Sequence, residues 1–175
     1  MVGKDAIRFF GHRQIVTAES RFVVGDLDAE ALPYAVKTLG LTLDEAQRQL
    51  TKESGLKGLS GGLSNDVRDI SEAAAKGHAK ARLALDVLVS EARRWIGNYL
   101  VQLNGADAIV FTAGIGENRV ELRAAICADL DQLGIVLDAA RNDATRATEA
   151  VISAASSRVK VMVIPTNEEI VVARE

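Results

Sequence analysis

Two glycines separate an apolar run from an amphipathic run in the stretch 111-FTAGIGENRVELRAAI-126. At Gly114 and Gly116 the main chain carries no Cβ, so a ligand can approach the backbone closely. The helix expected after them would also present free N–H groups to phosphate or hydroxyl oxygens. A tight turn between a strand and a helix, with Asn118 as the N-cap, explains the same spacing, because short Gly-x-Gly patterns are common. Both interpretations stay open.

Charged residues in two other segments also allow either a structural or a ligand-binding interpretation. Glu168 and Glu169 would begin the last expected helix, where the helix dipole favours a carboxylate by roughly 0.3–1 kcal/mol. One of them could instead reach a divalent metal, since Mg²⁺ prefers one or two carboxylates together with phosphate and water. Asp66 and Arg68, beside a glycine-rich stretch, are either a solvated first helical turn or a pair that holds a polar ligand.

The segments that would position these residues alternate between strands and helices, which indicates an α/β domain. Capping signals and apolar periodicity predict helices, the longest of them with an apolar stripe that favours core packing. These helices are expected over Ala29–Leu39 after Asp28, 42–50 with a Thr42/Glu45 capping box, Asp66–Ala75, 78–105, Val120–Leu133 and 166–175.

The remaining segments predict strands and one loop. The run 107–111 fits a buried strand, and 158–164 alternates Val159, Val161 and Val163 with other residues; both belong to the central sheet. The stretch 54–66 is expected to be a loop because it is rich in glycine. Two further extended pieces are expected at 6–10 and 14–24.

Composition limits the function. The 175 residues, 48% of them hydrophobic, suffice for one domain with a sizeable core. A net charge of −3, without a basic face, argues against a nucleic-acid or membrane surface. Cys127 is the only cysteine, and no signal-peptide pattern is present, so the reducing cytoplasm is the expected compartment. With His12 and His78 as the only histidines, a histidine-rich metal site is not expected.

Three segments taken together resemble the C-terminal half of acetate kinases: 54-SGLKGLSGGLSNDVRD-69, 111-FTAGIGEN-118 and 164-IPTNEEIVVAR-174. With 25-GDLD-28 included, the resemblance covers about Gly25 to Arg174, so we expect an acetate-kinase-like domain over 25–175 and an unmatched segment over 1–24. It implies a ribonuclease-H-like domain of the actin-like ATPase superfamily, a mixed sheet with flanking helices. It also implies Mg²⁺-dependent phosphoryl transfer from ATP to acetate or propionate.

The resemblance also implies roles for single residues. Asp66, Val67 and Arg68 match the segment that flanks the adenosine, and Glu168 matches a magnesium-linked glutamate. The loop against the adenine and ribose matches five residues, namely Gly114, Ile115, Gly116, Glu117 and Asn118.

The chain departs from the family pattern at its N-terminal end. Family members are more than twice as long, and their other domain supplies the acetate pocket and the catalytic histidines. Residues 1–20 do not match the family's phosphate-binding stretch, and Val23 stands where an arginine for the transferring phosphoryl group belongs. Arg21 could replace it only with a local shift, and the pair His12–Arg13 is more typical of a surface. No catalytic residue is therefore assigned.

Three functions remain. The first is an acetate kinase family domain whose isolated chain is incomplete. The second is a nucleotide-binding module without catalysis. The third is a structural or dimerisation module, because the family's homodimers form through this half.

Overall fold

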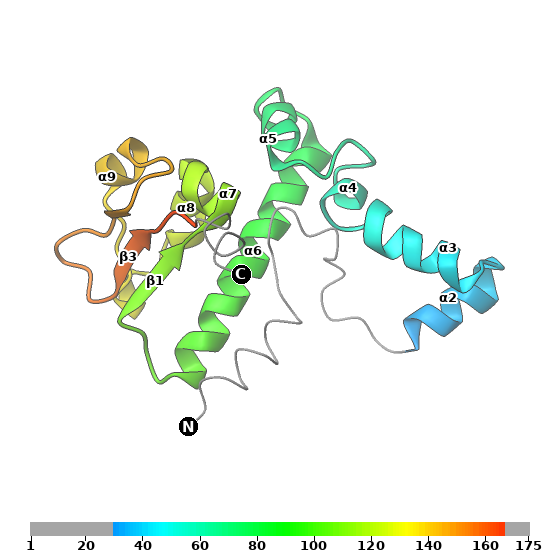
Figure 1. The fold of residues 1–175 in the computed structure, drawn as a ribbon, viewed down its shortest axis with the longest axis horizontal. Helices are drawn as coiled ribbons and strands as arrows, with labels where there is room; N and C mark the ends of the chain where they lie inside the picture. Colours follow the sequence, from blue (N-terminus) through cyan, green and yellow to red (C-terminus); the bar gives the residue numbers. More distant parts are fainter. Residues whose placement is uncertain (1–29, 167–175) are drawn as a thin grey trace, which may run out of the picture. The chain divides into compact units, whose positions relative to one another are not determined.

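The computed structural model describes residues 30–166, which divide into two compact units, 30–88 and 89–166 (Figure 1). Helix α6 (Ala79–Gln102) contributes residues to both units. The extended pieces expected at 6–10 and 14–24 lie outside the described residues. So does the closing helix expected over 166–175, of which only Thr166 is described.

The first unit is helical. Helix α2 begins at Ala31, two residues later than expected, with Glu30 at its N-cap, and ends at Leu39 before Gly40, whose φ is 67°. The unit also contains α3 (Leu43–Arg48), the π-helix η1 (Gln49–Glu53), α4 (Gly55–Leu59), α5 (Val67–Ala75) and the start of α6.

The capping box predicted for the second helix is confirmed. The Glu45 backbone N–H donates to Thr42 Oγ1 at 3.2 Å, and the Thr42 N–H donates to Glu45 Oε2 at 2.8 Å. Each bond satisfies an N–H that has no partner within the helix.

The stretch 54–66 is not a loop throughout, because α4 forms within it. Leu56 and Leu59 of α4 pack against the core of the first unit, so burial overrides the poor helix propensity of glycine. This core consists of Ile70 and Ala74 of α5 and Ala81 and Ala84 of α6. The prediction that the stripe of the long helix packs in the core holds at its start, for Ala81 and Leu85, whereas Leu103 at its far end is 68% exposed. Gly61 and Gly62, with φ of 78° and 88°, form the turn after α4, and Gly55 starts α4 with a φ of 58°; these left-handed conformations favour glycine.

The second unit holds a mixed three-stranded sheet in the order β1-β3-β2. Strand β1 (Ala108–Phe111) pairs in parallel with β3 (Lys160–Val163), from Ala108 opposite Lys160 to Phe111 opposite Val163. Both predicted strands are confirmed. The two-residue strand β2 (Ala150–Val151), too short to show a period in the sequence, pairs antiparallel with β3. The flanking segments are α7 (Ala113–Asn118), α8 (Val120–Cys127), the 3₁₀-helix η2 (Asp131–Leu133) and α9 (Ala139–Ala144).

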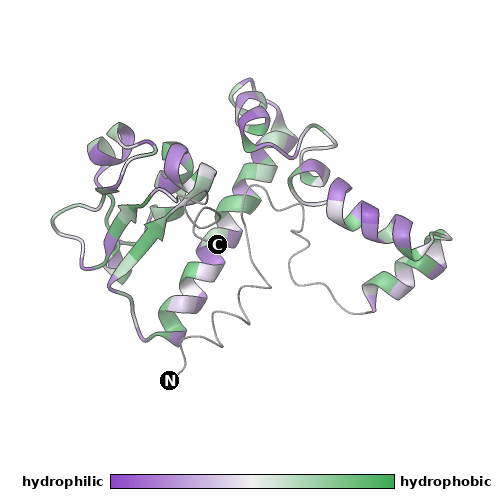
Figure 2. Ribbon diagram, viewed as in Figure 1, coloured by the Kyte–Doolittle hydropathy of each residue, from purple (hydrophilic) through white to green (hydrophobic). Residues whose placement is uncertain are grey.

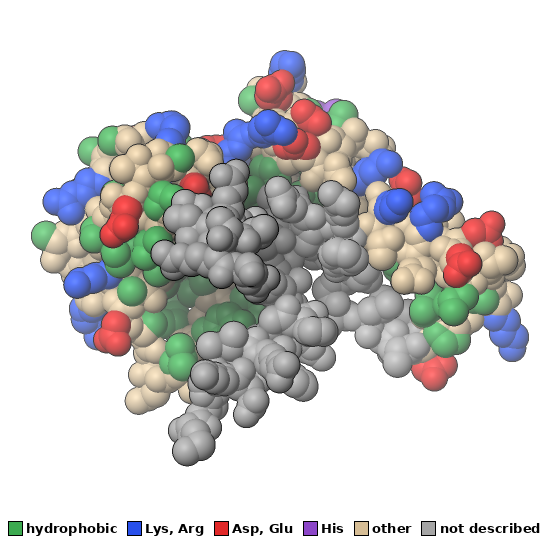
Figure 3. Space-filling model, in the orientation of Figure 1, with side chains coloured by type: hydrophobic (Ala, Val, Ile, Leu, Met, Phe, Trp, Pro, Cys, Tyr) green, Lys and Arg blue, Asp and Glu red, His purple; other side chains and the backbone are tan. Residues whose placement is uncertain are grey.

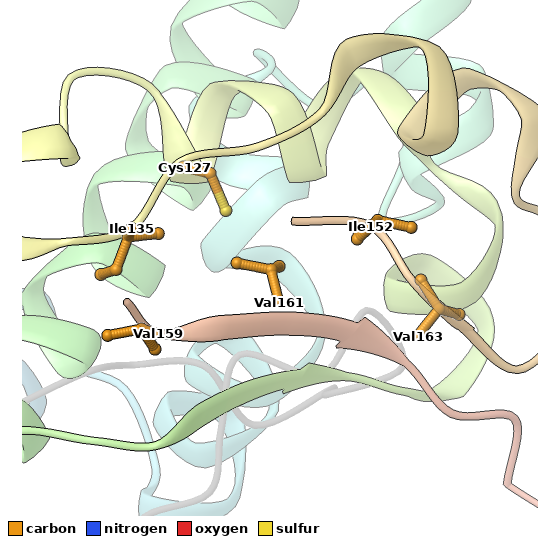
Figure 4. Close-up of a cluster of buried hydrophobic side chains, with 6 residues drawn as sticks. All are labelled: Cys127, Ile135, Ile152, Val159, Val161 and Val163. Atoms are coloured by element: carbon orange, nitrogen blue, oxygen red, sulfur yellow. The ribbon is translucent and has the colours of Figure 1, made fainter. Parts of the chain in front are cut away.

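One face of β3 carries the core of the second unit. Val159, Val161 and Val163 point toward Cys127, Ile135 and Ile152 (Figure 4), as the alternation predicted. Hydrophobic residues are concentrated on β1 and β3 (Figure 2).

Two expectations about this unit are wrong. Strand β1 is not buried: Ile109 and Phe111 pack against the core, but Ala108 and Val110 are exposed, because within residues 30–166 only one face of the strand is covered. The helix expected over Val120–Leu133 ends at Cys127, since Ala128 is extended and Asp129 has a φ of 54°. Arg93 of α6 donates to the freed carbonyl oxygens of Ile126 and Ala128, which stabilises this end.

Hydrophobic side chains also lie on the outside of the α2–α3 pair, where Tyr34, Leu39 and Leu43 are each at least 60% exposed (Figure 3). Of the helices in the described part of the chain, none is long and apolar enough to span a bilayer.

Candidate functional site

The glycine segment lies at the carboxyl end of β1, as predicted, but it is a short helix rather than an open loop. Thr112 is extended, Ala113 takes a left-handed φ of 59°, and α7 follows directly. The alternative with Asn118 as an N-cap is wrong. Asn118 is the last residue of α7, its Nδ2 donates to the Gly114 carbonyl at 3.0 Å, and Arg119 precedes α8 instead.

The two glycines have different surroundings. A Cβ at Gly116 would lie 3.1 Å from the carbonyl carbon of Phe111 and 3.4 Å from its Cα, so this glycine permits α7 to pack onto the end of β1. A Cβ at Gly114 would meet no heavy atom within 4 Å. Only Gly114 therefore leaves exposed backbone that a ligand can approach.

Sequence reasoning missed Arg123, which is 1% exposed and lies directly behind this segment. Its guanidinium makes five hydrogen bonds. Nη1 donates to the carbonyl oxygens of Gly116 and Glu117 at 2.8 and 2.9 Å, Nη2 to those of Asn142 and Thr145 at 3.0 and 2.7 Å, and Nε to Asn142 Oδ1 at 2.8 Å.

These five acceptors are neutral oxygens, and the backbone ones belong to the C-terminal ends of α7 and α9, where the helix dipole is negative. Burial lowers the pKa of Arg123, and the repulsion from Arg146 lowers it further. One signal was visible in the sequence. Arg123 lies three and four residues before Ile126 and Cys127, on the face of α8 that is buried.

Glu117 joins the second motif to the third. Its Oε1 accepts from the backbone N–H of Thr166 at 2.9 Å and from Thr166 Oγ1 at 3.3 Å. Its carbonyl oxygen accepts from Arg123 and, at 3.2 Å, from the N–H of Ala147. Both the carboxylate and the main-chain carbonyl of Glu117 are thus hydrogen-bonded within the protein.

In the first unit, Asp66 is the N-cap of α5 and accepts the Arg68 N–H at 2.8 Å. The Arg68 side chain returns to the same carboxylate, with Nη2 at 2.6 Å from Oδ2, and this hydrogen bond and ion pair raise the pKa of Arg68. Val67 is 3% exposed, so its side chain packs inside the unit. The capped first turn is therefore present, and the Arg68 side chain, 75% exposed, is the part that faces solvent.

The expected site residues fall into three sets. Asp66, Val67 and Arg68 belong to the first unit and Gly114 to Asn118 to the second, and each set forms a continuous local structure. Glu168, Glu169, Val23, Arg21, His12 and Arg13 lie outside the described residues. Within 30–166, no three His, Cys, Asp or Glu side chains form a cluster suited to a metal.

A model of the acetokinase family matches residues 20–174. The chain belongs to the acetokinase family. It is 46% identical over 151 residues to acetate kinase from Syntrophomonas wolfei and 49% identical over 152 residues to that from Treponema denticola. Each alignment covers 86% of this chain and 38% of the relative.

Solved structures show the same relationship. The crystal structure of Porphyromonas gingivalis acetate kinase superposes with a TM-score of 0.81 at 35% identity, over 88% of this chain and 38% of the other. A propionate kinase from Francisella tularensis gives 0.77 at 35% identity, with the same coverage. The chain therefore spans a little over a third of its relatives. The expected fold is confirmed: a mixed α/β domain with a small mixed sheet that matches the actin-like ATPase fold of acetate kinases.

Proposed function

We propose that this acetokinase-family chain is the nucleotide-side part of a phosphotransferase and binds ADP or ATP with Mg²⁺. The observation that carries the proposal is the open backbone at Gly114, at the carboxyl end of a parallel strand, where α/β folds bind ligands. Gly116 and Arg123 support it, because they hold the segment against β1 and α9 and leave Gly114 exposed.

The backbone from Gly114 to Asn118 would lie against the adenine and ribose, with Ile115 half-buried at its centre. Asp66 and Arg68 would flank the adenosine, since the Arg68 guanidinium is exposed while Val67 is committed to packing.

Glu168 would direct Mg²⁺ to the phosphates. A single carboxylate suits this ion, because it keeps waters and phosphate oxygens as its other ligands. Bound there, the ion would neutralise the charge on the phosphates. The proposed compartment is the cytoplasm, which suits a single buried Cys127.

Turnover needs more than this chain supplies. The acceptor, acetate or propionate in the relatives named above, would bind in the part of the family protein that this chain does not span. By the family resemblance Val23 stands where an arginine is expected, and one lost donor to developing charge typically lowers a rate by about 10²–10³. We therefore propose nucleotide binding without efficient phosphoryl transfer.

Titration calorimetry with ADP and Mg²⁺ tests the binding. We expect one nucleotide per chain. We also expect a weaker affinity for Gly114→Ala, whose new methyl group would lie where the nucleoside is proposed to bind and would touch no protein atoms. The matched control is Gly97→Ala on α6, at a second glycine of the same unit with open space around it and no left-handed φ. A folded wild-type sample that gives no heat with saturating ADP would contradict the proposal.

A coupled assay with ATP, Mg²⁺ and acetate tests the absence of turnover. We expect no rate above background, with Porphyromonas gingivalis acetate kinase as the positive control. A turnover near 1–100 s⁻¹, the usual range for kinases, would show that the chain is catalytically complete.

A non-catalytic dimerisation module is the second candidate. It is favoured by apolar residues exposed at the end of α6, where Val101 is 82% and Leu103 68% exposed. Exposed apolar groups of this kind mark protein interfaces when they form a contiguous patch.

A further inference from the structure

The carboxylate of Glu117 is directed at the protein chain. Its Oε1 accepts both the backbone N–H and the hydroxyl of Thr166, at 2.9 and 3.3 Å. Thr166 follows β3, and just before it the Ile164 N–H donates to the Phe111 carbonyl at 3.0 Å. Three hydrogen bonds thus connect the region around the end of β1 to the segment that leaves β3, and Glu117 accepts the two from Thr166.

The backbone of Glu117 is held from the opposite side. Arg123 Nη1 binds the carbonyl oxygens of Gly116 and Glu117, and the Ala147 N–H binds the second of these as well. Because Arg123 is buried and uses its other donors on Asn142 and Thr145, it cannot leave this position without losing all five bonds. A carboxylate on so fixed a backbone has a fixed position.

We infer that Glu117 is a positioning residue. Its carboxylate fixes the position of Thr166 against the glycine segment, while Arg123 holds its backbone. The inference rests on the proposed function for its purpose, since Glu168 follows Thr166 by two residues. Phosphoryl transfer depends on the relative position of nucleotide and metal, and a link between their two segments would maintain it. On this inference the carboxylate acts through Oε1 on Thr166 and not on the nucleoside.

Amide hydrogen exchange in the ligand-free protein tests the link directly. We expect the Thr166 amide to exchange about tenfold faster in Glu117→Ala, because its acceptor is lost. Glu117→Gln should restore protection, since an amide oxygen also accepts from N–H. The Arg158 amide, which donates to the Gly134 carbonyl at 2.9 Å, reports in each variant that the unit is folded. An unchanged Thr166 rate in a folded Glu117→Ala protein would overturn the inference.

ADP affinity with and without Mg²⁺ distinguishes positioning from direct contact. Positioning predicts that Glu117→Ala weakens binding severalfold with Mg²⁺, with little change in its absence, and that Glu117→Gln resembles wild type. The control for the lost charge is Glu149→Ala, on an exposed residue of the same unit. An equal loss in both conditions, shared by Glu117→Gln, would mean direct contact and overturn the inference. A wild type that binds no ADP contradicts the proposed function, and the exchange rates then decide the link alone.

Discussion

Arg123 shows how one buried side chain can organise several segments. Its five donors reach the ends of α7 and α9, and Asn142 in turn donates from Nδ2 to the Val120 carbonyl at 2.9 Å. A guanidinium suits this place because its planar fork presents five N–H groups in fixed directions, which an ammonium cannot do. The glycine segment is thus held by side-chain bonds as well as by packing.

Replacing Arg123 by Met should lower the free energy of unfolding by about 3 kcal/mol, because five buried or partly buried acceptor oxygens would lose a charged donor. Urea unfolding followed by the fluorescence of Trp95, the single tryptophan, would measure this change. Arg141→Met on α9 is the control. Its ion pair with Asp138, at 3.5 Å, is exposed and should contribute less than about 1 kcal/mol. Equal losses in both variants would contradict the assigned role of Arg123.

Burial raises the pKa of the Cys127 thiol from its ordinary value of 9.0 to about 11. The folded protein therefore holds this proton more tightly than the unfolded chain. Stability from this group is full below pH 9 and is lost as the pH rises from 9 toward 11. Since one pKa unit corresponds to about 1.4 kcal/mol, the loss amounts to roughly 2–3 kcal/mol.

Unfolding curves from pH 8 to 11 would reveal the Cys127 effect, with Cys127→Ala as the comparison. The alanine variant is less stable throughout because it loses packing, but its stability should fall less over this range. Parallel pH profiles for the two proteins would show that the thiol does not titrate as described.

At the scale of elements, the junction between β1 and α7 decides what the two glycines do. Gly116→Ala should destabilise the protein by about 1–3 kcal/mol, because its methyl would press on the Phe111 backbone. Gly114→Ala should leave stability unchanged or raise it by up to about 1 kcal/mol, since alanine restricts the unfolded chain and meets no atom in the folded one.

Thermal unfolding of the Gly114→Ala and Gly116→Ala variants measures their stability, and titration with ADP measures their affinity for the nucleotide. If the nucleoside binds against the Gly114 backbone, Gly114→Ala loses affinity for ADP but keeps the stability of the wild type. If Gly114→Ala instead unfolds as readily as Gly116→Ala, the open space at Gly114 is not present in solution.

At the scale of the whole molecule, the exposed apolar residues predict association. Light scattering should give a mass that rises with concentration from 18.7 kDa toward twice that value. The double variant Val101→Asp/Leu103→Asp should stay monomeric, whereas Thr148→Asp, at an exposed polar residue, should behave as wild type. A wild-type mass that stays at the monomer value at every concentration would remove the support for dimerisation.

The sequence by itself determined the features that depend on neighbouring residues. The Thr42/Glu45 capping box, the alternation of valines in β3 and the helix capped by Asp66 are each specified within a few residues, and all three were found in the structure. The three motifs were likewise readable one at a time, and together they predicted the acetokinase family, which the comparison with known proteins confirmed. The assigned roles of the site residues stay predictions.

Only the tertiary structure decided the features that depend on distant residues. The bonds of Arg123 to Asn142 and Thr145 span 19 and 22 residues, and the bond from Thr166 to Glu117 spans 49. Whether a glycine faces a backbone or open space, as at Gly116 and Gly114, is equally a matter of what packs against it. Residue spacing records the period of one segment, whereas these contacts arise when separate segments are brought together by burial of a shared core.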